Sequence, residues 1–115
     1  MQKNNRTNGG VVCMDKIKAL EKATQYANLV IKKIQAEKVV LYGSYAKDNW
    51  KNDSDIDIAI VVKTIEDDIL EIETMLYKLR RNIDDRIEPI LLEEKNDKSG
   101  FLNEVLKYGQ IIYTS

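Results

Sequence analysis

The sequence of 115 residues contains no histidine, one cysteine and one proline. Without histidine there can be no histidine-based acid–base catalysis, no histidine metal ligand and no serine–histidine or cysteine–histidine nucleophile pair. The lone Cys13 can form neither an internal disulfide nor a cysteine zinc site, which favours a reducing compartment. No apolar run approaches the roughly 18 residues of a membrane span, and the N-terminus lacks a signal-peptide core. We therefore expect a cytoplasmic protein that does not enter a membrane.

A strong charge of either sign is also missing. The chain has 18 basic and 19 acidic residues and a formal net charge of −1. This balance gives no broad attraction to nucleic acid or to an anionic membrane, so we expect no strong nucleic-acid binding. Residues 1–13 are polar and rich in asparagine and glycine, and we expect a disordered extension there. The length predicts one domain, which we assign to residues 14–115.

Hydrophobic periodicity predicts helices that alternate with short strands. The predicted helices cover residues 15–34, 64–81 and 101–108, and the predicted strands cover residues 38–42, 56–62, 86–92 and 111–113. This order is typical of an α/β or α+β fold with a small central sheet flanked by helices.

Three local patterns refine this prediction. In the first helix, apolar residues at 3/4 spacing are expected to form the core-facing side, with Thr24 filling a gap in the pattern. These apolar residues are Ile17, Leu20, Ala27, Ile31 and Ile34. Thr64-x-x-Asp67 resembles a capping box at the start of the second helix. Pro89 removes a ladder donor from the third strand, so we expect an edge position or a bulge there.

Two aspartates stand at the start of the apolar strand 56–62. Because side chains alternate along a strand, Asp55 and Asp57 share one face. Their Cα atoms would lie about 6.6 Å apart, so the carboxylates could converge on one magnesium ion or bracket a pair of ions. Two partly desolvated like charges are costly without a cation, which favours a metal site. A solvated strand rim is the alternative that this short motif leaves open.

A glycine and a serine follow the strand at residues 38–42. Gly43-Ser44 and a short helical turn through Lys47 would direct backbone N–H groups and a hydroxyl at an anion, and glycine allows a close approach. An ordinary turn with a serine N-cap is the alternative. Together with the aspartates, the segment predicts a phosphate-binding turn followed by magnesium ligands, as a metal-bound triphosphate requires. No GxxxxGK[ST] motif occurs, which excludes a P-loop.

The composite pattern resembles a known signature. Gly43-Ser44-Tyr45-Ala46 followed by Ser54-Asp55-Ile56-Asp57-Ile58-Ala59 is similar to the motif of the DNA polymerase beta-like nucleotidyltransferase superfamily. The chain from about Met14 to Tyr113 resembles its smallest members, the minimal nucleotidyltransferases. The resemblance implies a palm-like fold with a small mixed sheet. It also implies magnesium-dependent transfer of a nucleoside monophosphate, AMP from ATP, onto a hydroxyl, with release of pyrophosphate.

The resemblance further implies roles for individual residues. Gly43 and Ser44 would hold the β- and γ-phosphates, and Lys47 stands where many relatives have a phosphate-contacting arginine. Asp55 and Asp57 would bind two magnesium ions. The family's third carboxylate helps to bind the catalytic metal or deprotonates the acceptor hydroxyl, and Glu88, on a strand that could lie beside the aspartates, matches it best. Asp84 and Asp85 compete for this role, but they precede the strand and are expected to form a turn.

The sequence says least about the molecule whose hydroxyl would receive the nucleoside monophosphate. The chain contains a catalytic core and little else, so a separate molecule would have to complete the acceptor site. Minimal nucleotidyltransferases are commonly paired with a HEPN-class toxin, which implies an antitoxin that modifies a tyrosine of such a partner. Two alternatives stay open: transfer to a small molecule such as an aminoglycoside, and a weakly active or inactive module that binds NTP or a partner. Tyr77 is interpreted as a boundary or packing residue, and Trp50 as a base or partner contact or as packing.

Overall fold

The computed structural model describes residues 16–47, 54–66, 68–97 and 99–115. Trp50 and the predicted extension at residues 1–13 lie outside these residues. The described elements are α1 (Lys16–Ile31), β1 (Lys38–Tyr42), β2 (Ile56–Val62), α2 (Ile69–Leu79), the 3-10 turn η2 (Arg80–Asn82), β3 (Ile87–Glu93), the 3-10 turn η3 (Glu94–Asn96), α3 (Phe101–Tyr108) and β4 (Gln110–Thr114). The helices and strands occur in the predicted order, with β2 as the next described element after β1, and the α+β class is confirmed.

The four strands form one mixed sheet in the order β3-β2-β1-β4. β1 is antiparallel to both of its neighbours, whereas β2 and β3 are parallel. The end of β1 therefore lies beside the beginnings of β2 and β3. Pro89 lies in β3 at the edge of the sheet, which confirms the edge position that its missing N–H predicted.

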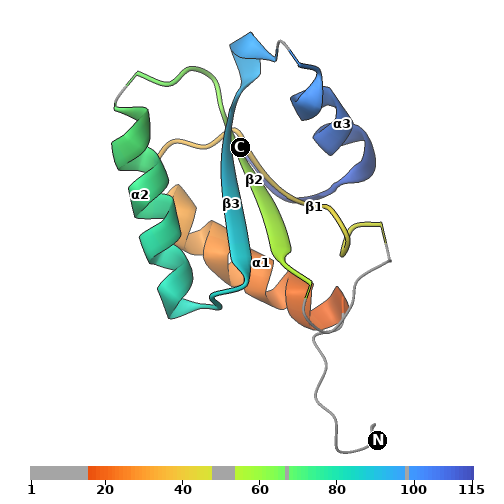
Figure 1. Cartoon of the computed structure of the whole chain (residues 1–115). Helices are drawn as coiled ribbons and strands as arrows, with labels where there is room; N and C mark the ends of the chain where they lie inside the picture. Colours follow the sequence, from red (N-terminus) through yellow and green to blue (C-terminus); the bar gives the residue numbers. More distant parts are fainter. Residues whose placement is uncertain (1–15, 48–53, 67, 98) are drawn as a thin grey trace, which may run out of the picture.

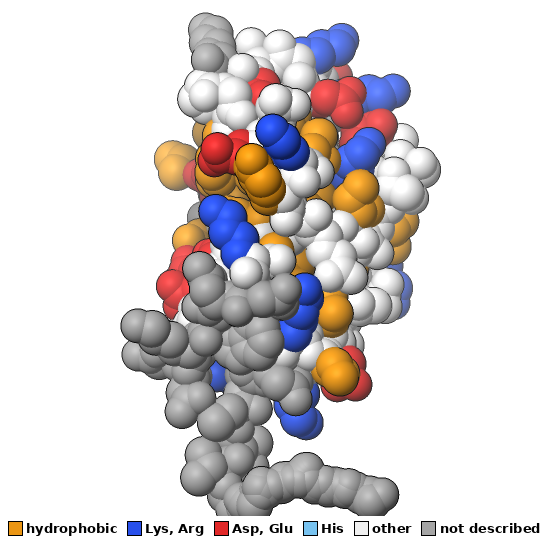
Figure 2. All heavy atoms as spheres, turned by 90° about the vertical axis from the view of Figure 1, so that its right-hand side faces the viewer, with side chains coloured by type: hydrophobic (Ala, Val, Ile, Leu, Met, Phe, Trp, Pro, Cys, Tyr) orange, Lys and Arg blue, Asp and Glu red, His pale blue; other side chains and the backbone are white. Residues whose placement is uncertain are grey.

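The sheet separates two apolar layers (Figure 1). α1 and α2 cover one face, where Val39, Leu41 and Ile58 are buried, while α3 covers the other face over Val40 and Ala59. Alternation along the strands explains the division, because residues of even and odd number point to opposite sides. Figure 2 views the molecule from the side of α3 and shows acidic, basic and hydrophobic side chains interspersed over the described part of that surface.

The packed side of α1 differs from the prediction. The helix ends at Ile31, Ile17 is 68% exposed, and Thr24 is exposed as well. The buried side chains are instead Ala19, Ala23, Tyr26, Ala27 and Val30. Small alanine side chains let the helix backbone lie close to the sheet, and the Tyr26 hydroxyl reaches across to donate to Leu76 O of α2 at 2.6 Å. The prediction was right for Ala27, which is buried, and for Leu20 and Ile34, which pack against the core, but it missed Ala19, Ala23 and Tyr26.

The start of α2 also differs, and the capping-box prediction at Thr64 is wrong. The helix begins at Ile69, and its N-cap is Asp68, whose carboxylate accepts from the Leu70 N–H at 2.9 Å. The Ile65 N–H donates to Glu93 Oε2 at 2.6 Å, at the end of β3. This tertiary hydrogen bond holds the segment before the helix in a non-helical conformation.

None of the helices in the described part of the chain is both long enough and apolar enough to cross a membrane.

Candidate functional site

The predicted phosphate-binding turn directly follows β1. Gly43 has a φ of +76°, in the left-handed region that glycine adopts without strain. The Lys47 N–H donates to Gly43 O at 3.1 Å and closes one helical turn, as the sequence predicted. Tyr45 within this turn is completely buried in the core, so its side chain anchors the turn to the sheet. Ser44 is half-buried beside it.

Gly43 also lies against Asp57. A Cβ built on Gly43 would overlap the Asp57 side chain, with Oδ2 as the nearest atom. The carboxylate of Asp57 therefore lies directly against the backbone of the turn. Two motifs that are 14 positions apart in the sequence meet because β1 and β2 are antiparallel and Tyr42 pairs with Asp57.

Three side chains form a row across the strands at this end of the sheet. In the strand register Asp57 is the Cα partner of Tyr42 on β1 and of Glu88 on β3. All three are half-buried on the face that carries α3. Asp55 precedes β2 and is exposed, and its charge acts on Asp57. The resemblance matched Glu88 on a strand that could lie beside the aspartates, and the parallel pairing of β2 with β3 places it next to Asp57.

The electrostatic environment of Asp57 is unfavourable for a negative charge. Burial raises the pKa of this carboxyl to about 6, and the charges of Asp55 and Glu88 add to the effect. The pKa of the Tyr42 hydroxyl is also raised, to about 12. Burial is the largest cause, and the charges of Asp57 and Glu88 add to it. Negative charge thus accumulates around Asp57 at this end of the sheet.

The carboxylate of Glu88 is engaged by α2 and the turn after it. Glu88 Oε2 accepts a hydrogen bond from the Tyr77 hydroxyl at 3.2 Å, and Oε1 lies 3.7 Å from Nη1 of Arg80. Within residues 16–47, 54–66, 68–97 and 99–115, no three acidic or cysteine side chains are gathered closely enough to hold a metal ion. Asp57 is paired with Glu88 in the strand register and follows Asp55 by two residues, but the three carboxylates are not gathered at one point. The carboxylate of Glu88 is held by Tyr77 and Arg80.

The donor set nevertheless fits magnesium. Carboxylate oxygens are the ligands that this hard cation prefers in proteins. Asp57 is partly desolvated and repelled by Asp55 and Glu88, a conflict that a divalent cation would relieve. Asp55 and Asp57 are the residues that would hold such an ion, with Glu88 as the adjacent carboxylate.

Asp84, which competed with Glu88 as the third carboxylate, is engaged in other contacts. Asp84 accepts hydrogen bonds from Arg86 N at 2.8 Å and Nε at 3.1 Å, and it also forms an ion pair with Lys22. These contacts outweigh burial and lower the pKa of Asp84. Asp84 and Asp85 precede β3, as expected for a turn. Lys47 is exposed, with Nζ 5.9 Å from the ring centroid of Tyr108.

Sequence reasoning missed the neighbours of these residues. Tyr42 was assigned only to a strand, Tyr77 to a boundary or packing position, and Arg80 to no part of the site. For Tyr42 a signal was present, because the residue just before Gly43 on an antiparallel strand must lie near the following aspartates. For Tyr77 and Arg80 no local signal existed, since their contact with Glu88 depends on how α2 packs along β3.

Comparison with known proteins identifies the family. The model of the polymerase beta nucleotidyltransferase family matches residues 24–115. The chain belongs to this family, and it is a nucleotidyltransferase that uses an NTP as substrate. Its recognition as a minimal nucleotidyltransferase is thereby confirmed.

Two relatives in Methanocaldococcus jannaschii are each named a "putative protein adenylyltransferase". One is 34% identical over 69% of this chain and 81% of its own length, and the other is 33% identical over 67% and 78%. A "putative nucleotidyltransferase" from Sulfolobus solfataricus has a similar structure, with a TM-score of 0.64 and 25% identity over 86% of this chain and 83% of its own. A toxin–antitoxin structure with AMP-PNP shares the fold, with a TM-score of 0.56 and 18% identity over 80% and 73%.

Proposed function

We propose that this chain transfers AMP from ATP, with magnesium, onto a tyrosine hydroxyl of a partner protein. The observation that carries the proposal is the position of Asp57. Its carboxylate lies against Gly43 of the proposed phosphate-binding turn, and Asp57 is paired with Glu88 on the neighbouring strand. The names of the M. jannaschii relatives support a protein acceptor. The toxin–antitoxin neighbour supports a partner, for which a helical HEPN-type toxin is our candidate. The chain would then be the antitoxin and act in the cytoplasm, where ATP is available.

Each site residue has a distinct part in this proposal. Gly43 and Ser44 bind the β- and γ-phosphates through the backbone and the hydroxyl of the turn, and Lys47 adds positive charge beside it. Asp55 and Asp57 hold magnesium, which when bound neutralises the triphosphate and the charge on attacking and leaving oxygens. Glu88 accepts the proton of the acceptor hydroxyl. The oxygen attacks the α-phosphorus, and pyrophosphate leaves.

Binding and transfer test this proposal separately. Calorimetric titration with ATP and magnesium should show binding that Asp57→Asn weakens by about tenfold or more, because one ligand charge is lost. Glu88→Gln should retain binding but lose transfer, as expected for a proton acceptor. Asp85→Asn, a change of an exposed acid just before β3, is the matched control and should behave like the unmodified chain.

Transfer is followed with α-labelled ATP and the protein that co-purifies with the chain. Label on a tyrosine of that protein, dependent on Asp57, supports the proposal. Label on an added aminoglycoside instead would support the small-molecule alternative, and a stable complex without label the inactive binding module. Equal nucleotide binding by the unmodified chain and Asp57→Asn would refute the proposed site.

A further inference from the structure

The Tyr77 hydroxyl is the protein group that donates a hydrogen bond to Glu88. It lies 3.2 Å from Glu88 Oε2, while the Arg80 guanidinium stacks over the Tyr77 ring at 4.9 Å from its centroid. Arg80 also lies 3.7 Å from Glu88 Oε1 and donates to Ile87 O at 3.0 Å. These contacts fix the position of the phenol, so its hydroxyl points at the proposed proton acceptor.

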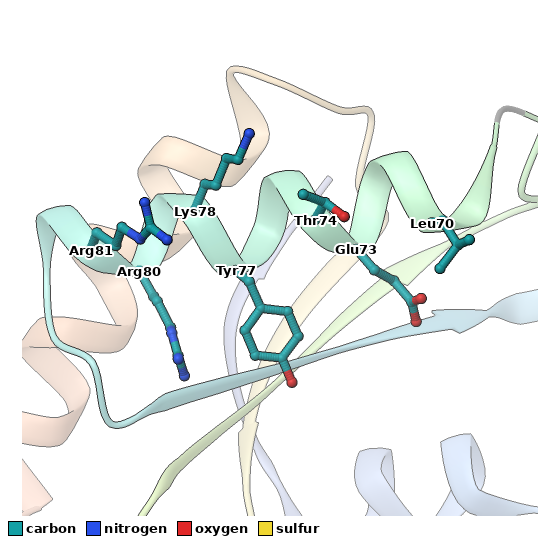
Figure 3. Close-up of a pocket in the computed structure, with 7 residues that line it drawn as sticks. All are labelled: Leu70, Glu73, Thr74, Tyr77, Lys78, Arg80 and Arg81. Carbon is teal, nitrogen blue, oxygen red and sulfur yellow. The ribbon is translucent and has the colours of Figure 1, made fainter.

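Tyr77 is also accessible from outside. Its surface is 42% exposed, and it lines a shallow pocket of about 280 Å³ on α2 together with Leu70, Glu73 and Arg80. Figure 3 shows Tyr77 and Arg80 extending side by side toward the sheet, whereas Lys78 points away from it. β3 is an edge strand, so no further strand of the sheet lies between the solvent and this hydroxyl. A bound nucleotide could therefore approach Tyr77 without displacing the core.

The hydroxyl lies next to the proposed magnesium ligands as well. Glu88 is paired directly with Asp57 in the parallel register of β2 and β3. Tyr77 thus continues the row of Tyr42, Asp57 and Glu88 by one further side chain. A tyrosine hydroxyl beside the third carboxylate offers the chemistry that the proposed reaction requires of its acceptor.

We propose that Tyr77 is itself an acceptor, so that the chain attaches AMP to its own α2. This inference rests on the proposed function and names an acceptor within the same site. The bond between Tyr77 Oη and the α-phosphorus forms, and the bond from the α-phosphorus to the oxygen bridging to the β-phosphate breaks. The hydroxyl proton passes to the Glu88 carboxylate, and pyrophosphate leaves. The product is a tyrosine–AMP phosphodiester on the rim of the site.

The test uses the full chain alone with magnesium and ATP. α-labelled ATP should label the chain and γ-labelled ATP should not, and peptide mass spectrometry should find one AMP on Tyr77. Tyr77→Phe should remove the label, as should Asp57→Asn. Tyr113→Phe is the matched control and should keep the label, because Tyr113 is a half-buried tyrosine on β4 at the opposite edge of the sheet.

A second measurement does not depend on turnover. The analogue α,β-methylene-ATP cannot release pyrophosphate, and with magnesium it should protect Tyr77 from acetylation by N-acetylimidazole while leaving the acetylation of Tyr113 unchanged. If the unmodified chain binds ATP with magnesium but shows neither label nor protection at Tyr77, this inference is wrong and the proposed function stands. If Asp57→Asn binds ATP as well as the unmodified chain, the proposed function fails first. Label that persists in Tyr77→Phe would overturn the inference even in an active enzyme.

Discussion

At the scale of single residues, Gly43 is constrained in two independent ways. Its φ of +76° lies in the left-handed region, and its missing side chain leaves room for the Asp57 carboxylate. Gly100 has nearly the same φ, +75°, but open space where a Cβ would be added. Both glycines therefore have a backbone conformation that disfavours other residues, but of the two only Gly43 has another side chain packed against it.

This difference gives a matched prediction. Gly100→Ala should lower the free energy of unfolding by about 1 kcal/mol, the cost of a left-handed alanine. Gly43→Ala should lower it by about 3 kcal/mol, because overlap with Asp57 is added. Urea denaturation of both variants measures the two values. In an Asp57→Ala background the cost of Gly43→Ala should fall toward that of Gly100→Ala, and an unchanged cost would contradict the role of the overlap.

At the scale of elements, α2 shows how local signals compete. Thr64 and Asp68 both offer an oxygen that could cap a helix, and only Asp68 does so. The Thr64 hydroxyl donates to Glu66 Oε2 at 3.2 Å, on the surface. The Ile65 N–H donates instead to the Glu93 carboxylate, and this hydrogen bond disfavours a helix that starts at Thr64. In turn, hydrogen bonds from Asn96 and then from Ile65 lower the pKa of Glu93, because both favour its charged form.

The two candidate caps should respond differently to truncation. Asp68→Ala removes the acceptor of the Leu70 N–H and should lower the free energy of unfolding by about 1 kcal/mol. Thr64→Ala removes only an exposed side-chain contact and should change it by less than about 0.5 kcal/mol. Urea denaturation or amide hydrogen exchange in the first turn of α2 would show the difference. A larger effect at Thr64 would restore the capping box that the sequence suggested.

At the scale of the whole molecule, the site reduces the stability of the fold. The pKa of Asp57 rises from 3.8 to about 6, so the folded chain holds this proton more tightly than the unfolded chain. Stability therefore falls as pH rises from about 4 to about 6, and it stays lower above that range. Repulsion among carboxylates in a metal-free site is the physical cause, after burial itself.

Asp57→Asn should consequently stabilise the metal-free protein. At about pH 7.5 with a chelator, the gain should be on the order of 1 to 2 kcal/mol, a range discounted for solvent screening at this half-exposed carboxyl. At about pH 3 the gain should nearly vanish, because Asp57 is then largely protonated in both the folded and the unfolded chain. Thermal or urea denaturation at both pH values measures it, with Asp85→Asn as the control.

With magnesium present, the unmodified protein should be more stable than Asp57→Asn. An ion that binds only the folded chain raises the stability of the unmodified protein, and Asp57→Asn should lose this gain. A variant that is less stable than the unmodified chain in the chelator at neutral pH would contradict the electrostatic account of the site.

The sequence by itself determined whatever is local. The Gly43-Ser44 turn and the edge position of Pro89 follow from backbone sterics and from the missing N–H of proline. The shared face of Asp55 and Asp57 stays a prediction, because Asp55 precedes β2. These features act within a few residues and need no partner from elsewhere in the chain. The α+β class followed in the same way, from the order of the periodic segments.

The tertiary structure alone decided which distant segments meet. The pairing of Glu88 with Asp57, the contact of Tyr77 with Glu88 and the alanine side of α1 depend on strand register and on helix packing. Register and packing minimise the free energy of the whole core, so no short window of sequence contains them. For this reason the sequence could indicate candidate site residues, whereas it could not indicate the tyrosine and the arginine that hold Glu88.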